Sequence, residues 1–315
     1  MVLDEQFLEA EERKGFYIRS MMKRVWACQM EMLEQFDKAC RKHGIRYFAD
    51  AGTLLGAVRE QGYIPWDDDL DIGMLRTEYE RFKKSAFLEL PKEYRLENDR
   101  SDGCNISDLV VHLRNGERLS MAPDHLMVHY GCPYVVCIDI SVYDNLPDDA
   151  EERKVFSALY QNVFWLIWQV EKDATIKDCP ENVKEIILDL ERLTGFSFQP
   201  DRAIRVQLYV LLDYLSASYC KTDSEQVAIM GYYMHNEKIV IKREWIEESS
   251  YMPFEKMQVP VPIGYDELLK VWYGDYRIPV QQKGDHDYPY FRSQEAKLIE
   301  EYKNRGWKIP DYILQ

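Results

Sequence analysis

Four aspartates crowd into one short segment of the N-terminal third of the chain: Asp67, Asp68, Asp69 and Asp71. Carboxylates at this spacing raise one another's pKa unless a cation compensates their charge. If residues 69–74 form a strand, alternate side chains share one face, so Asp67, Asp69 and Asp71 would lie together. Carboxylate oxygens are hard ligands that suit Mg²⁺ or Mn²⁺. The segment therefore predicts a catalytic metal site.

Two other interpretations of this acidic segment are open. An exposed acidic turn is common on protein surfaces, but apolar residues flank the aspartates closely: Ile64, Trp66, Leu70 and Ile72. A calcium-binding EF-hand loop matches the spacing of the carboxylates from Asp67 to Glu78. Such a loop needs glycine at its sixth position, where this chain has Ile72. We therefore favour the metal-dependent enzyme over a calcium-binding module.

A glycine turn precedes the aspartates. Residues 45–50 are predicted to form a strand and residues 54–60 a short helix, with Gly52 and Thr53 at the turn between them. Glycine lets backbone N–H groups approach a phosphate closely, and Thr53 adds a hydroxyl donor. A glycine turn, a helix and an acidic strand in this order favour binding of a phosphate-containing substrate beside the metal.

A third carboxylate should come from a neighbouring strand. Asp139 is embedded in the apolar strand predicted over residues 134–143, where an unpaired charge is costly. We expect Asp139 to complete the metal site, with Asp144 as the reserve. The alternative is a sheet-edge aspartate that bonds to local backbone.

Hydrophobic periodicity predicts the elements that position these residues. The expected helices are 17–43, ending at a Gly44 cap, one starting at Thr77 with a capping box, 148–171, 180–193, 201–219, 265–273 and 293–304. Further strands are expected at 94–97, 106–114, 227–231 and 238–241. The fold class is α+β: a small mixed sheet flanked by helices. We divide it into a catalytic portion, 1–147, and a mainly helical portion, 148–315, that completes the active site and the acceptor-binding surface.

The composition of the chain limits the classes of molecule that it is expected to bind. With 55 acidic and 40 basic residues, the net charge is −15, which gives little of the phosphate attraction that drives nucleic-acid binding. We therefore expect no nucleic-acid partner. The seven cysteines contain no C-x-x-C pair and are expected to be reduced thiols. The spacing of His125 and His129 suits zinc on a helix, but no third ligand is evident.

No membrane-spanning segment is expected. The N-terminus lacks an apolar stretch, and the longest apolar run, 155–170, is interrupted by polar residues. We expect a cytoplasmic protein. Trp165 and Trp168 allow a peripheral contact with the inner membrane face, although a buried core helix is the interpretation we favour.

The block from residue 51 to residue 74, with its Gly-Thr turn and Asp-rich strand, closely resembles the LicD family, which includes bacterial phosphocholine transferases and is related to fukutin and fukutin-related protein. The dense similarity covers about residues 42–82 and returns at Tyr273, Gly274, Asp275 and Tyr276. The resemblance implies a nucleotidyltransferase-like fold and a phosphotransferase reaction. A CDP-alcohol such as CDP-choline or CDP-ribitol, with CDP-choline the donor we favour, would donate its phospho-alcohol to a sugar hydroxyl of a cell-surface glycan such as teichoic acid or lipopolysaccharide, and CMP would leave.

The resemblance also suggests roles for individual residues. Asp69, Asp71 and Asp139 would hold Mg²⁺ or Mn²⁺, and Asp67 would orient the acceptor or a water. The expected substrate-binding residues are Gly52, Thr53, Arg59, Trp66, Lys283 and His286. Trp66, Tyr63, Tyr273 and Trp272 are available to surround a trimethylammonium group. Two alternatives remain in this type of active site: a nucleotidyltransferase acting on a small acceptor, and a metal-using glycosyltransferase.

Overall fold

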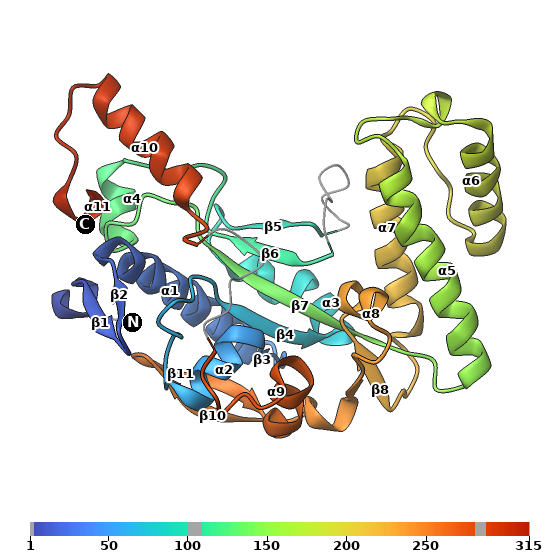
Figure 1. The fold of residues 1–315 in the computed structure, drawn as a ribbon, viewed down its shortest axis with the longest axis horizontal. Helices are drawn as coiled ribbons and strands as arrows, with labels where there is room; N and C mark the ends of the chain where they lie inside the picture. Colours follow the sequence, from blue (N-terminus) through green and yellow to red (C-terminus); the bar gives the residue numbers. More distant parts are fainter. Residues whose placement is uncertain (1–2, 100–108, 281–287, 315) are drawn as a thin grey trace.

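The computed structural model describes residues 3–99, 109–280 and 288–314 (Figure 1). The chain begins with a hairpin of β1 (Glu11–Arg13) and β2 (Phe16–Ile18), followed by the long helix α1 (Ser20–Lys42). Gly44, with φ +59°, follows α1 in the left-handed conformation expected of a glycine cap. Short 3₁₀ turns occur at Glu5–Leu8, Ala86–Glu89, Ile176–Asp178, Ala217–Tyr219 and Arg243–Trp245.

A mixed sheet lies at the centre of the protein. Its main strands follow the order β3 (Phe48–Ala49), β4 (Asp71–Leu75), β7 (Cys137–Asn145), β6 (Val111–Arg114) and β5 (Arg95–Glu97). β4 and β7 are parallel, and the other neighbours are antiparallel. β8 (Gln226–Ala228) pairs with the end of β7, and β9 (Ile241–Lys242) pairs with β8. The predicted α+β class with a mixed sheet is confirmed.

Helices surround this sheet and close the larger of two hydrophobic cores. They are α1, α2 (Ala51–Arg59), α3 (Arg76–Lys84), α9 (Tyr265–Tyr273), α10 (Arg292–Asn304) and α11 (Asp311–Leu314). The short helix α4 (Pro123–Val128) contributes no buried residue. Side chains from both ends of the chain meet in this core, because Trp26 of α1 and Leu298 of α10 are both fully buried in it. Residues that follow the helical middle of the chain therefore complete the portion that carries the aspartates.

The middle of the chain forms a helical lobe with its own core. Helices α5 (Ala150–Gln169), α6 (Glu181–Thr194) and α7 (Ile204–Ser216) project beyond the sheet, with α8 (Met230–His235) at their base (Figure 1). A buried ion pair joins this lobe to the sheet. Arg76 of α3 contacts Asp144 of β7 and Asp213 of α7, each at 2.7 Å.

Several predicted elements differ from the structure. The strand expected at 45–50 is limited to β3, and the turn expected at 51–53 is already the first turn of α2. α3 begins at Arg76 without the capping box predicted at Thr77, since Leu75 occupies the cap position and makes no side-chain bond there. The strand expected at 106–114 is β6 within the described residues, and 106–108 lie outside them.

A hairpin of β10 (Ser249–Phe254) and β11 (Met257–Pro262) was not predicted. Pro253, Pro260 and Pro262 disfavour strands in a larger sheet because proline cannot donate to a ladder. The hairpin forms a separate two-stranded sheet, where donors on the outer side need no partner. Its apolar side chains, including Phe254, are buried in the larger core.

The described part of the chain contains no helix that is both long and apolar enough to cross a membrane. Within α5, Leu166 and Ile167 are buried, whereas Trp165 is 50% exposed and Trp168 is 63% exposed. The favoured interpretation of this run as buried core is therefore wrong for the two tryptophans, which lie on the surface of the lobe.

Candidate active site

The parallel pairing of β4 and β7 brings three of the predicted carboxylates together. The register places Asp71 opposite Asp139, and the Asp139 N–H donates to the carbonyl oxygen of Leu70 at 2.8 Å. Ligand oxygens of Asp69, Asp71 and Asp139 all lie within 4.8 Å of one another. Three carboxylates at this spacing form a donor set that fits a hard divalent cation.

The acidic segment is extended, but it is not a strand throughout as expected. β4 begins at Asp71, and residues 67–70 precede it in irregular structure. The burial pattern still alternates: Asp68 and Leu70 are buried, while Asp67 and Asp69 are half-buried. Asp68 accepts a hydrogen bond of 2.7 Å from the backbone N–H of Tyr290, so this aspartate helps fasten the segment to the C-terminal part of the chain.

Helix α1 fixes the backbone of the acidic segment. Trp26 donates its indole N–H to the carbonyl oxygen of Asp67 at 3.2 Å, and Gln29 donates to that of Asp68 at 3.0 Å. Tyr63 donates to the Gln29 side chain at 3.0 Å and stacks on Trp26 with 4.5 Å between ring centroids. These buried contacts hold the segment before any ligand binds, which is the preorganisation that a metal site requires.

The carboxylates experience strong mutual repulsion. Burial raises the pKa of Asp67 well above its ordinary value, and Asp69 raises it further through its charge and a shared hydrogen bond. Burial raises the pKa of Asp71 as well, followed by the charges of Asp69 and Asp139. Asp50, behind them, has its pKa raised to about 6 by burial. A bound divalent cation would relieve this accumulation of negative charge.

Gly52 and Thr53 contact the acidic strand directly. The Gly52 N–H donates to Oδ2 of Asp71 at 3.1 Å, and Oγ1 of Thr53 accepts from the Asp71 N–H at 2.8 Å. A Cβ atom on Gly52 would lie 2.5 Å from Oδ2 of Asp67. Glycine is thus required here for helix α2 to approach the carboxylates. The expected phosphate contacts of both residues stay a prediction.

The other expected substrate-binding residues are more dispersed. Arg59 donates to Glu60 at 2.8 Å and to the carbonyl oxygen of Tyr276 at 3.1 Å, so it anchors the segment after α9. Trp66 packs edge-on against Phe16 at 6.2 Å. Lys283 and His286 lie outside the described residues. The substrate roles of these four residues stay predictions.

The structure does not support three alternative metal-ligand assignments that the sequence left open. Asp144, the reserve ligand, is buried in its ion pair with Arg76. Glu78, which would end a calcium loop, pairs instead with Arg81 at 2.7 Å. Among the described residues, no group with metal-ligand spacing includes His125 or His129.

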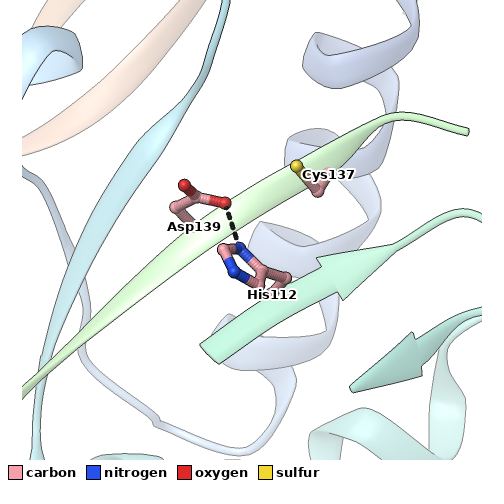
Figure 2. A group of neighbouring side chains, drawn as sticks. All are labelled: His112, Cys137 and Asp139. Carbon is pink, nitrogen blue, oxygen red and sulfur yellow. Dashed lines mark hydrogen bonds and ion pairs between the residues drawn. The ribbon is translucent and has the colours of Figure 1, made fainter. Parts of the chain in front are cut away.

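Two residues near the carboxylates were not assigned a catalytic role from the sequence. His112 of β6 lies opposite Asp139, and its Nδ1 is 2.6 Å from Oδ1 of that aspartate (Figure 2). The sequence feature that could have identified His112 is the alternation of β6, where apolar Val111 and Leu113 share one face and His112 lies on the other. Tyr273, named only as an aromatic neighbour for trimethylammonium, has its pKa raised by burial and then by the carboxylates, Asp71 first.

A separate cavity of about 680 Å³ lies between the N-terminal hairpin and the β10–β11 hairpin. Tyr63 and Pro65 line it, together with charged residues such as Arg13 and Lys23, but none of the metal-site aspartates does. Several charges on its wall are already paired, as between Arg13 and Glu255. This cavity is therefore distinct from the carboxylate site.

A parallel strand pair with clustered aspartates, approached by a glycine at a helix N-terminus, is the arrangement expected of a nucleotidyltransferase-type metal site. Comparison with known proteins agrees: the family model for the LicD, fukutin and fukutin-related protein nucleotidyltransferase domain matches residues 44–105. The expected resemblance to the LicD family is therefore confirmed.

Individual relatives extend the similarity. The chain is 25% identical over 256 residues to the lipopolysaccharide cholinephosphotransferase LicD of Haemophilus influenzae, covering 80% of this chain and 90% of the relative. An uncharacterized protein of Rickettsia typhi is 43% identical over 70 residues, 22% of this chain and 23% of that protein. A similar protein of Rickettsia prowazekii is 49% identical over 45 residues, 14% of this chain and 17% of that protein.

Proposed function

We propose that this protein is a metal-dependent phosphotransferase that moves phosphocholine from CDP-choline to a sugar hydroxyl of a lipopolysaccharide-type glycan and releases CMP. The observation that carries the proposal is the cluster of Asp69, Asp71 and Asp139 within 4.8 Å. Similarity to a lipopolysaccharide cholinephosphotransferase over 80% of the chain supports a transferase and suggests this donor and acceptor.

The three carboxylates would hold Mg²⁺ or Mn²⁺. The ion would supply neutralisation of the diphosphate and of the charge that develops on the leaving CMP. Asp69 and Asp71 approach the site from the acidic segment, and Asp139 approaches it from β7. Because α1 and β7 fix both backbones, the carboxylates need little reorganisation when donor and cation enter.

Asp67 is suited to take the acceptor's proton. Burial is the first cause of the raised pKa of Asp67 and persists when a bound cation offsets the neighbouring charges, so this carboxylate would be a better base than an ordinary aspartate. The hydroxyl oxygen would form a bond to the distal phosphorus of the donor as the bond from that phosphorus to the bridging oxygen breaks. The proton goes to Asp67, and CMP leaves with the bridging oxygen.

The remaining expected groups would surround the donor. The N-terminus of α2 at Gly52 and Thr53 is positioned beside the carboxylates, so the positive end of the helix dipole suits the phosphates while the Gly52 N–H keeps its bond to Asp71. Tyr273 adds an aromatic ring near the same aspartates and suits the choline headgroup. The exposed tryptophans of α5, Trp165 and Trp168, would allow contact with a membrane surface that carries a lipid-linked acceptor, at the cytoplasmic face.

A second candidate is nucleotidyl transfer to a small acceptor. The description of the matching family model as a nucleotidyltransferase domain favours it. The two reactions differ in the bond that breaks: phosphotransfer from CDP-choline releases CMP, whereas nucleotidyl transfer from CTP releases pyrophosphate.

The deciding experiment is a product assay with purified protein, lipopolysaccharide and Mg²⁺ or Mn²⁺. CDP-choline, CDP-ribitol, CDP-glycerol and CTP are offered separately, and CMP and pyrophosphate are both measured. Release of CMP with choline incorporated into the glycan, abolished by EDTA, is the expected result. Release of pyrophosphate from CTP alone would replace this proposal with nucleotidyl transfer.

A variant pair links the activity to the site. Asp69→Asn removes a charge without changing volume and should abolish CMP release while the fold survives. Asp189→Asn, on the exposed side of α6, is the matched control and should retain wild-type activity. Full activity of Asp69→Asn in Mg²⁺ would overturn the metal-site assignment.

A further inference from the structure

A second group of metal-competent side chains adjoins the carboxylate site. His112, Cys137 and Asp139 place ligand atoms within 4.8 Å of one another, and all three are half-buried. Figure 2 shows His112 and Asp139 turned toward each other across β6 and β7, with Cys137 further along β7. None of the expectations drawn from the sequence included His112 or Cys137 in a metal site.

Strand geometry explains why the three side chains meet. Cys137 and Asp139 are two residues apart on β7, so they share one face of the sheet. The antiparallel register places His112 directly opposite Asp139 and Arg114 opposite Cys137. The side chains of His112 and Asp139 are 25% and 23% exposed, so an ion from solvent can reach them.

The donor types select a different ion from the carboxylate site. Imidazole nitrogen, thiolate sulfur and carboxylate oxygen are together typical of Zn²⁺ and related transition metals, whereas Mg²⁺ avoids thiolates. Three protein ligands leave a fourth tetrahedral position for water. Metals bind cysteine as the thiolate, so binding here would release the Cys137 proton to the solvent.

We propose that His112, Cys137 and Asp139 form a second metal site that takes a zinc-class divalent transition metal. Because Asp139 belongs to both groups, the two sites are thermodynamically linked. A cation that draws on the charge of Asp139 lowers the affinity of the carboxylate site for Mg²⁺. The linkage rests on the proposed Mg²⁺ site, whereas the transition-metal site itself does not.

Cobalt spectroscopy tests the site without any activity assay. The metal-free protein is titrated with Co²⁺, which reports a bound thiolate by its near-ultraviolet charge-transfer band, and Zn²⁺ should displace the cobalt. The band is expected in the wild type and in Cys220→Ser, a half-buried cysteine outside the cluster. It should be lost in Cys137→Ser. The absence of a band in the wild type, or its persistence in Cys137→Ser, would overturn the proposal.

Three further measurements separate a ligand role from a structural one and the two metal sites from each other. His112→Asn keeps a nitrogen donor for Asp139 but removes the imidazole, so it should weaken Co²⁺ binding by about tenfold or more. Zn²⁺ should raise the Mg²⁺ concentration needed for half-maximal stabilisation by about fivefold or more in the wild type and not in Cys137→Ser. Asp69→Asn should keep the cobalt band, so loss of the Mg²⁺ site and loss of the transition-metal site are distinguishable. Unchanged Co²⁺ affinity in His112→Asn would remove His112 from the ligand set.

Discussion

Replacing Gly52 with alanine tests the geometry of the carboxylate site most directly. The added Cβ would lie 2.5 Å from Oδ2 of Asp67, whereas ordinary van der Waals contact begins at 3.4 Å. The Asp67 carboxylate must therefore move by about 0.9 Å, the difference between these two distances. Trp26 holds the Asp67 backbone, so the side chain has to turn away from its present position.

The expected cost falls on activity rather than on stability. Misplacing a catalytic group by ~1 Å costs about 10²-fold in rate, or roughly 2.7 kcal/mol of transition-state stabilisation. Gly52 lies in the first turn of α2 without a positive φ, and alanine there gains about 0.5–1 kcal/mol of helix propensity, which offsets part of the strain.

The assay measures kcat/KM for CMP release and the midpoint of urea unfolding for Gly52→Ala. Gly116→Ala is the matched control, because nothing lies within 4 Å of its added Cβ and its φ is not positive. We expect about 10²-fold lower kcat/KM in Gly52→Ala and wild-type activity in Gly116→Ala, with both proteins folded. Wild-type kcat/KM in Gly52→Ala would refute the assignment of Asp67 to the reaction.

Three other predictions follow from the charges of the protein. In EDTA, the melting temperature should fall as pH rises from about 4 to 6. Burial raises the folded pKa of Asp50 from 3.8 to about 6, so the stability that its protonated form provides at low pH is lost as the group ionises. Mg²⁺ should offset this fall, and a melting temperature that does not change with pH would contradict the prediction. Asp71→Asn should melt higher than the wild type in EDTA, because it removes a buried repelling charge, yet lose activity on the order of 10³-fold; a lower melting temperature would count against the repulsion. Arg76→Met should lower the free energy of unfolding by about 3–5 kcal/mol by leaving Asp144 buried and unpaired, whereas Arg192→Met, in an exposed pair, should change it by less than about 1 kcal/mol. Similar urea midpoints for the two arginine variants would show that the Arg76 pair does not stabilise the protein.

The sequence was most informative where chemistry and local pattern coincide. Four aspartates beside apolar flanks, and Asp139 inside an apolar strand, identified the three carboxylates that the structure brings together. Helices with clear one-face periodicity were also found, and α9 has the predicted bounds. Each of these inferences depends on residues within a few positions of one another.

Contacts between distant segments were beyond such reasoning. Gly52 was interpreted as a phosphate-binding glycine, but the carboxylate that makes glycine necessary is Asp67, which α2 reaches only after the chain folds back. His112 meets Asp139 through the pairing of β6 with β7, and neither residue's neighbours in sequence reveal that register. The β10–β11 hairpin was not predicted, and its two-stranded topology, which tolerates the prolines, was not visible in the sequence.

The register of the sheet, and not the acidic motif alone, determines whether a metal site exists. Asp71 and Asp139 face each other because the neighbouring pair, Ile72 and Ile140, is fully buried on the opposite face. A slip of β7 by one residue would turn its two buried isoleucines, Ile138 and Ile140, to the other face and Asp139 away from Asp71. Burying two isoleucine side chains stabilises this register by roughly 3–6 kcal/mol. The repulsion that one crowded carboxylate introduces is smaller, about a few kcal/mol at most. The apolar alternation of β4 and β7 therefore holds the carboxylates together against their own charge.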